Sequence, residues 1–126
     1  MRPQTTVPTC LLVIALLVVP GSASATQTYQ FRFEKDTTVD VTFSVPASLS
    51  LELTVNRGNT KLSVYAPDGR LVFEGIAAPD QPLRAHIGDM LLGTFRAVYD
   101  LPEGSNQQAS TIVSCWPNCD AILANG

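Results

Sequence analysis

The stretch from Thr37 to Phe73 reads TTVDVTFSVPASLSLELTVNRGNTKLSVYAPDGRLVF and determines the fold class. Apolar residues occupy every second position on both sides of Pro46, namely Val39, Val41, Phe43 and Val45, then Leu49, Leu51, Leu53 and Val55. Because the side chains of a strand point alternately to the two faces of a sheet, this spacing predicts half-buried strands, and helical spacing does not fit it. The stretch therefore predicts an all-β protein.

Turn-forming residues divide the rest of the chain into short segments of the same alternating kind. Pro67-Asp68-Gly69 is the strongest hairpin signal, because proline fixes φ, aspartate bonds its own backbone and glycine accepts a positive φ. The pattern predicts about eight strands, at residues 28–34, 39–45, 49–55, 61–66, 70–74, 83–87, 91–101 and 109–115. Short strands at this spacing are typical of an antiparallel β-sandwich or a jelly-roll-like fold. The tail, residues 116–126, shows no period.

The junction Pro46-Ala47-Ser48 has two interpretations. If the segments on either side pair directly, a three-residue loop sets Val45 opposite Leu49 and keeps the apolar faces together. If the chain instead arches between two sheets, that pairing does not form. Both interpretations place the odd-numbered residues of the stretch in the core.

The N-terminal segment has the three parts of a secretory signal peptide. Arg2 is followed by an apolar run from Cys10 to Val19 and by the small residues Ala23, Ser24 and Ala25. That run is far shorter than the roughly 20 residues that span a bilayer, so we expect cleavage after Ala25 and no membrane-embedded segment. The sequence thus predicts a signal peptide at residues 1–25 and a single β-sandwich domain at residues 26–126, secreted or periplasmic.

Cys115 and Cys119 are the two cysteines that remain once the signal peptide is removed. In an oxidising compartment they predict a disulfide that closes a loop in the C-terminal tail, worth about 2 kcal/mol by loop closure. The alternative is a redox pair, but such sites place two residues between the cysteines, and three lie between these. Trp116, inside the loop, either caps the end of the sandwich or stacks on a sugar, and is the one binding candidate.

Charge and residue types exclude several classes of function. The formal net charge is −3 and the basic residues do not cluster, so we expect no nucleic-acid partner. His86 alternates with Ala85 and Ile87, which predicts a solvent-facing residue, and the spacing of the serines does not point to nucleophilic catalysis. Asp36 and Asp40 would lie about 13 Å apart along a strand, beyond the roughly 5 to 9.5 Å of glycosidase acid pairs.

The remaining acidic residues give no cofactor site. Asp68, Asp80 and Asp89 fall in turns, where aspartate bonds local backbone more often than it binds calcium. A long-range pair such as Asp40 with Asp100 stays open, because spacing cannot test it. We therefore expect no catalytic residue, no metal ligand and no cofactor, with calcium as a possibility that these residues do not support.

Four segments carry a resemblance to a known family: DVTFSVPA at residues 40–47, LELTV at 51–55, KLSVYAPDGRL at 61–71 and GTFRAV at 93–98. Residues 39–100 thereby resemble the bacterial pre-peptidase C-terminal (PPC) domain family. The resemblance implies a jelly-roll-like, non-catalytic appendage of secreted enzymes, some of whose relatives bind calcium or polysaccharide. The chain departs from that family in its additional aromatic strand at residues 28–34, its C-terminal cysteine pair and the lack of an attached peptidase.

These features together predict a secreted, non-enzymatic β-sandwich module with a binding or auxiliary role, its partner a protein or a polysaccharide. The alternatives are a small secreted hydrolase and a protease inhibitor on the same scaffold. A cleft holding His86 with a carboxylate would favour the hydrolase, and a rigid protruding loop around Trp116 would favour the inhibitor.

Overall fold

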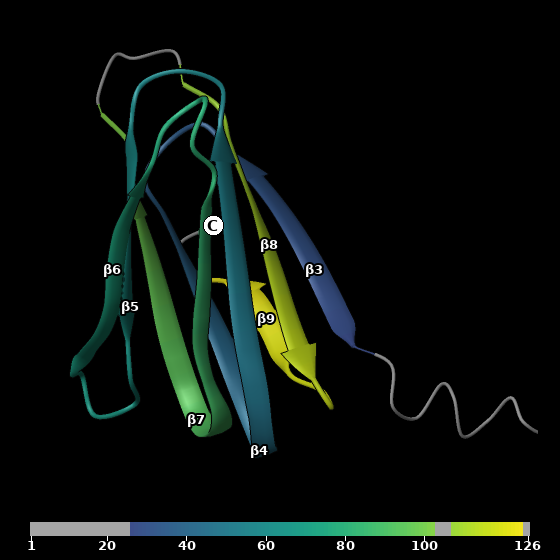
Figure 1. Ribbon diagram of the computed structural model, residues 1–126. Helices are drawn as coiled ribbons and strands as arrows, with labels where there is room; N and C mark the ends of the chain where they lie inside the picture. Colours follow the sequence, from purple (N-terminus) through teal and green to yellow (C-terminus); the bar gives the residue numbers. More distant parts are fainter. Residues whose placement is uncertain (1–25, 103–106, 125–126) are drawn as a thin grey trace, which may run out of the picture.

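The protein is described by a computed structural model that covers residues 26–102 and 107–124. These residues form seven strands and no helix, which confirms the predicted all-β class (Figure 1). The strands are β3 (Gln27–Phe33), β4 (Thr37–Val55), β5 (Thr60–Tyr65), β6 (Leu71–Ala77), β7 (Leu83–Asp100), β8 (Ala109–Trp116) and β9 (Asp120–Leu123). The expected signal peptide, with its cleavage site at Ala25, lies outside the described residues.

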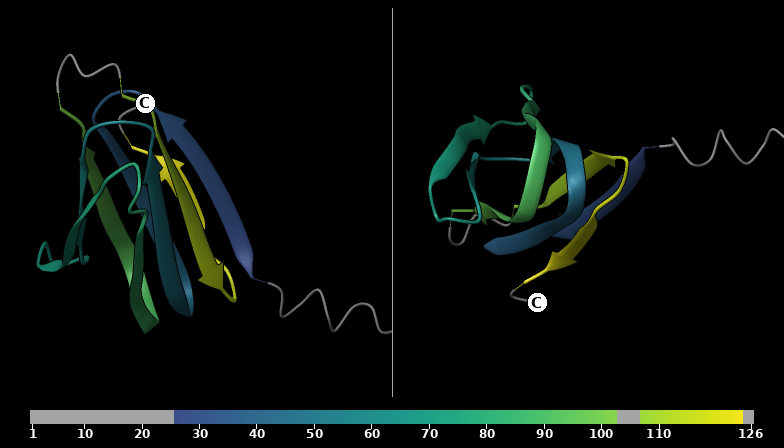
Figure 2. Two further views of the ribbon diagram at one scale, coloured as in Figure 1. Left: turned by 45° about the horizontal axis from the view of Figure 1, so that its top comes forward. Right: turned by 90° about the horizontal axis from the view of Figure 1, so that it is seen from below.

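The strands build two facing layers that share β4 and β7 (Figures 1 and 2). The front layer contains β3, β8, residues 48–55 of β4 and residues 83–88 of β7, all paired antiparallel. The back layer contains β9, residues 37–43 of β4, residues 93–100 of β7, β5 and β6, again antiparallel. The protein is therefore an antiparallel sandwich whose two long strands pass together from one layer into the other.

The junction at Pro46 is an arch, so the direct pairing of Val45 with Leu49 is wrong. Phe43 lies opposite Gly93 and Leu49 lies opposite Gly88, with register shifts between these two pairs. Proline has no backbone N–H, so the ladder is interrupted at Pro46 and the strand can bend there. The second interpretation is right that these segments do not pair and that the chain arches, but the arch joins two layers of one continuous sheet and not two separate sheets.

The same bend accounts for the difference in strand number. The two strands expected at residues 39–45 and 49–55 are one strand, β4, and those expected at 83–87 and 91–101 are one strand, β7. The turn predicted at Gly88-Asp89 is a register shift inside β7, where this strand follows the arch of β4. The tail contributes β9, which pairs with β4 between Val39 and Thr42 and was missed because four residues show no usable period.

The hairpin predicted at Pro67-Asp68-Gly69 is confirmed. Gly69 has a φ of 88°, its N–H donates to the carbonyl of Ala66, and the Asp68 carboxylate accepts from the N–H of Arg70 at 3.0 Å. This hairpin touches the arch, because a Cβ on Gly93 would come within 2.8 Å of the Pro67 ring. Gly93 also has a φ of 90°, so both its conformation and its surroundings require glycine.

The core consists of the odd-numbered residues of β4, as predicted, with one exception. Val39, Val41, Phe43, Leu49, Leu51, Leu53 and Val55 are buried, and they face inward-pointing residues of β5, β7 and β8. Tyr29, Phe31 and Phe33 of β3 also point toward this core. The exception is Val45, which is 42% exposed because the arch carries it out of both layers. The prediction that Val45 is buried is therefore wrong.

Tyr99 links the two layers through the middle of the core. It is fully buried, and its ring lies 5.1 Å from the ring of Phe33 in the front layer. The Tyr99 hydroxyl donates to Thr111 Oγ1 at 2.7 Å, and Thr111 donates in turn to the backbone carbonyl of Glu52 at 3.1 Å. Burial raises the pKa of Tyr99 to about 12, and the hydrogen bond to Thr111 opposes this only in part.

The arch can be tested with two valines of the same strand. Val41→Ala should destabilise the protein by about 1 to 3 kcal/mol, because it leaves a cavity in the core. Val45→Ala should cost less than about 0.5 kcal/mol, because Val45 lies on the surface. Denaturant titration of both variants measures these free energies. Equal losses at the two positions would contradict the arch.

Tyr99 predicts a dependence of stability on alkaline pH. Since its pKa is about 12 in the folded state against an ordinary 10.0, the protonated hydroxyl stabilises the fold fully below pH 10. This contribution should fall as the pH rises from 10 to 12. Tyr99→Phe should cost about 0.5 to 1.5 kcal/mol at pH 7 and should show a shallower decline above pH 10. If the unfolding free energies of the two proteins fell equally steeply above pH 10, Tyr99 would not be the group responsible for the alkaline loss of stability.

Candidate functional site

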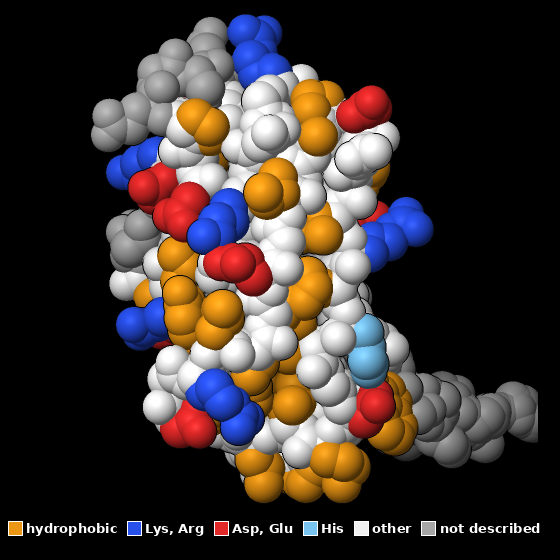
Figure 3. Space-filling view, turned by 60° about the vertical axis from the view of Figure 1, so that its left-hand side comes forward, with side chains coloured by type: hydrophobic (Ala, Val, Ile, Leu, Met, Phe, Trp, Pro, Cys, Tyr) orange, Lys and Arg blue, Asp and Glu red, His pale blue; other side chains and the backbone are white. Residues whose placement is uncertain are grey.

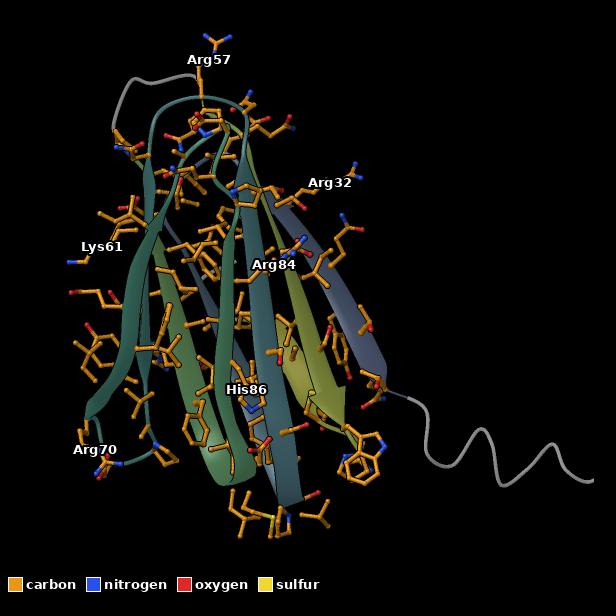
Figure 4. All side chains as sticks on the ribbon, in the orientation of Figure 1. Arg32, Arg57, Lys61, Arg70, Arg84 and His86 are labelled. Carbon is orange, nitrogen blue, oxygen red and sulfur yellow. A yellow bond between two sulfur atoms is a disulfide. The ribbon has the colours of Figure 1, made fainter. Side chains whose placement is uncertain are left out.

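The outer face of the front layer carries a depression of about 450 Å³. The even-numbered residues of β4 point outward there, and the ladder sets Ser50 opposite His86 on one side and Ser114 on the other. In the next row Glu52 lies between Arg84 and Ile112. The depression is lined by Ser50, Leu51, Glu52, Arg84, Ala85, His86, Ile112 and Ser114. It is therefore a shallow depression on the sheet, with the polar side chains of Arg84 and His86 at its β7 side (Figure 4) and more apolar than polar surface in its lining.

His86 joins a serine and a carboxylate into one hydrogen-bonded chain. Its Nδ1 lies 3.1 Å from Ser50 Oγ, and its Nε2 lies 2.8 Å from Asp89 Oδ1. The histidine and its acidic neighbour are visible at the edge of the surface in Figure 3. Asp89 lies three positions after His86, and the register shift at Gly88 places both side chains on the same face of the sheet. Asp89 therefore bonds the His86 ring and not local backbone, contrary to the prediction. The prediction that His86 faces solvent is confirmed.

Among the described residues, this Ser50–His86–Asp89 chain has the residue types of a nucleophilic site but differs from such a site in its exposure and in the backbone around the serine. The side chains of His86 and Asp89 are 55% and 76% exposed, so water screens the interactions on which proton transfer would depend. An oxyanion also needs preorganised donors, often backbone N–H groups. Ser50 lies in the ladder between β7 and β8, where backbone groups are used for strand pairing. The arrangement is therefore suited to hydrogen bonding at a surface.

Glu52 and Arg84 form the second polar pair of the depression. Arg84 Nε donates to Glu52 Oε2 at 3.0 Å, and the Arg84 side chain is 80% exposed against 32% for Glu52. The guanidinium is therefore oriented by one bond while the rest of its donors face solvent. Because the two charges compensate, the pair offers hydrogen-bonding groups without a strong net potential.

The predicted disulfide between Cys115 and Cys119 is present, and the loop it closes is tied to the sheet. The N–H of Cys119 donates to Gln27 Oε1 at 2.9 Å, and Tyr29 donates its hydroxyl to the carbonyl of Cys119 at 2.7 Å. Both partners belong to β3, at the edge of the front layer. The loop is therefore held against the sandwich.

Trp116 extends the outer row of β8 beyond the depression. It follows Ser114 by two positions, so both point to the same face, and it lies opposite Ser48 of β4. It is 49% exposed, so it does not cap the core as a buried residue. The structure thus places the predicted binding candidate next to a depression that the sequence did not reveal.

The acidic residues considered from the sequence serve other purposes. Asp36 Oδ1 accepts from the N–H of Leu101 at 2.8 Å, and Asp40 binds Arg96 through both carboxylate oxygens at 2.9 and 3.2 Å. This hydrogen bond and the charge of Asp40 raise the pKa of Arg96 above its ordinary value. Within residues 26–102 and 107–124, no three His, Cys, Asp or Glu side chains gather as a metal site would require. The expectation about calcium and other cofactors stays a prediction.

Sequence reasoning missed Ser50 and Asp89, and only the strand register could have found them. Ser50 is 36 residues from His86, and nothing in its neighbourhood distinguishes it from other serines of the chain. Had β4 and β7 been recognised as one long ladder with Thr37 opposite Tyr99, counting along it would have set Ser50 against His86. The ladder cannot be recognised from local periodicity, because the arch interrupts the alternation in both strands.

Comparison with known proteins adds no identification. No protein-family model matches the chain, and no curated protein matches it. The resemblance to the PPC family therefore stays a prediction. In the part of the chain that the structure describes, no helix is long and apolar enough to cross a membrane.

Proposed function

We propose that the protein is a secreted or periplasmic, non-catalytic module that binds a neutral polysaccharide on the outer face of its front layer. The observation that carries the proposal is the half-exposed Trp116 in line with the depression on the same face, where polar side chains surround a mostly apolar floor. An indole offers a flat apolar surface on which the C–H face of a sugar ring can stack. The groups beside it supply hydrogen bonds to hydroxyls.

The spacing along β8 fits an extended chain of sugar units. On the same face of β8, Ser114 lies two positions before Trp116 and Ile112 lies four positions before it. At 3.3 Å per residue these positions are about 7 and 13 Å from Trp116. Ser50 and the Arg84–Glu52 pair lie alongside those two positions on the neighbouring strands. A sugar stacked on Trp116 would therefore be followed by units lying over the depression.

The charges favour a neutral glycan over an acidic one. In the depression itself Arg84 is compensated by Glu52 and His86 faces Asp89, so neither of these two basic side chains is left to select a uronate or a sulfate. A protein partner is less well supported, because the depression is shallow and carries the charged pairs of Arg84 and His86, whereas the centre of a typical protein interface is depleted of charged residues.

Titration calorimetry with neutral oligosaccharides of several linkages tests this function. We expect one or more of them to bind, and Trp116→Ala to weaken that binding at least about tenfold, because stacking is lost. The matched control is Ile76→Ala, which removes an apolar side chain of somewhat greater exposure from β6 and should leave affinity unchanged. The absence of any binding, or equal effects of the two substitutions, would reject the proposal.

The second candidate function is ester hydrolysis, favoured by the hydrogen-bonded chain of Ser50, His86 and Asp89. An activated serine would react with an organophosphonate, which mass spectrometry detects as an adduct on Ser50. Because the relay is exposed and without preorganised donors, we expect no adduct and equal slow hydrolysis of nitrophenyl esters by the protein and by Ser50→Ala. Stoichiometric labelling of Ser50 would instead establish a hydrolase.

The inhibitor alternative rests on the loop around Trp116 and is weaker. Its three central residues are held between two cysteines, and the backbone of Cys119 is bonded to β3 at both its N–H and its carbonyl. The loop is rigid, but it lies along the edge of the sandwich, so it offers little extended backbone to a protease cleft.

A further inference from the structure

The arch where β4 and β7 pass between the layers exposes large apolar side chains at one end of the molecule. Met90 is 76% exposed, Leu92 is 51% exposed and Val45 is 42% exposed. The two arching segments lie side by side, because Ala47 pairs with Leu91. Hydrophobic side chains are accordingly gathered at the lower end in Figure 3. We name residues 44–48 and 88–92 the apolar arch.

The fold does not require apolar side chains at these three exposed positions. Segments that connect layers at a surface normally carry polar residues, and a polar side chain at Val45, Met90 or Leu92 would leave the core unchanged. Three large apolar side chains on two adjacent segments instead form a contiguous patch, and such patches mark protein or membrane contacts. A patch of this kind is typical of a contact surface for a molecule outside the chain.

Its charge and position point to one class of occupant. The apolar arch contains no Lys or Arg, and its one charged residue, Asp89, is bonded to His86. The adjoining hairpin adds one charge of each sign, Asp68 and Arg70, so neither an anionic nor a cationic partner is favoured. Trp116 lies beside the arch, opposite Ser48, and tryptophan concentrates at the level of lipid headgroups.

We propose that the apolar arch docks the protein on a zwitterionic lipid surface, with Met90, Leu92 and Val45 entering the headgroup region. A projecting end with a few apolar side chains suits a fluid surface, into which it can insert without a matching cavity. The docked protein would keep the depression of the front layer open, because the arch lies at the end of the sandwich, whereas Trp116 would lie at the lipid surface (Figures 1 and 4). The inference does not depend on the proposed glycan site.

Vesicle co-sedimentation with phosphatidylcholine tests the docking. The protein is used as recovered after export, with its N-terminus checked by mass so that an uncleaved apolar segment does not supply the binding. We expect sedimentation with the vesicles, little change with salt, and no gain when phosphatidylglycerol is added. Because Trp116 is the one tryptophan of the chain, its emission should also shift to shorter wavelength on docking.

Two variants decide whether the arch is responsible. Met90→Asp with Leu92→Asp should weaken vesicle binding at least about tenfold. Ile76→Asp changes a side chain that is 60% exposed on β6, away from the arch, and should bind as the unaltered protein does. Thermal unfolding checks that both variants fold, and glycan titration should be unchanged in both. No sedimentation of the unaltered protein, equal losses in the two variants, or binding that requires anionic lipid would overturn the proposal.

Discussion

The antiparallel ladder between β4 and β7 runs through both layers of the sandwich, and the rest of the structure depends on it. The two strands stay paired from Thr37 opposite Tyr99 to Leu53 opposite Leu83, apart from the shifts at the arch. All other strands attach to one of these two or to their neighbours. Because register is fixed on each side of the arch, the inward side chains of both layers meet in one core, and the outward ones form rows that cross several strands.

Glu52 connects the candidate binding surface to the core. The backbone carbonyl of Glu52 accepts the hydrogen bond that begins at Tyr99, while its side chain holds Arg84 on the outer face. This surface therefore lies directly above the buried link between the layers. A rigid support of this kind lowers the entropy that a ligand must remove from the side chains it contacts.

The three surface features considered above occupy different parts of the scaffold. The depression lies on the front layer, Trp116 stands where that layer ends, and the apolar arch closes the same end. The disulfide fixes Trp116 next to both. Trp116 belongs to both proposals, so a glycan stacked on it and a lipid surface at the arch would compete for the same side chain.

The sequence by itself determined the class of fold, the inward face and the disulfide. Alternation with period two is a local property of each strand, so the buried positions from Val39 to Val55 could be read without knowing which strands pair. The cysteines lie four residues apart, and their pairing was predicted from their number and from the export that the N-terminal segment suggests. The hairpin at Pro67-Asp68-Gly69 could also be predicted from its own three residues alone.

Only the tertiary structure decided what depends on contacts between distant segments. Whether Pro46 ends a strand or bends one is set by the partner strand, and the same contact decides that Val45 is exposed. The meeting of Ser50, His86 and Asp89 follows from the register across that bend, and the polar row beside Trp116 follows from the pairing of β8 with β4. A period records which face a residue points to, whereas its neighbours on that face are fixed by long-range pairing that the period does not contain.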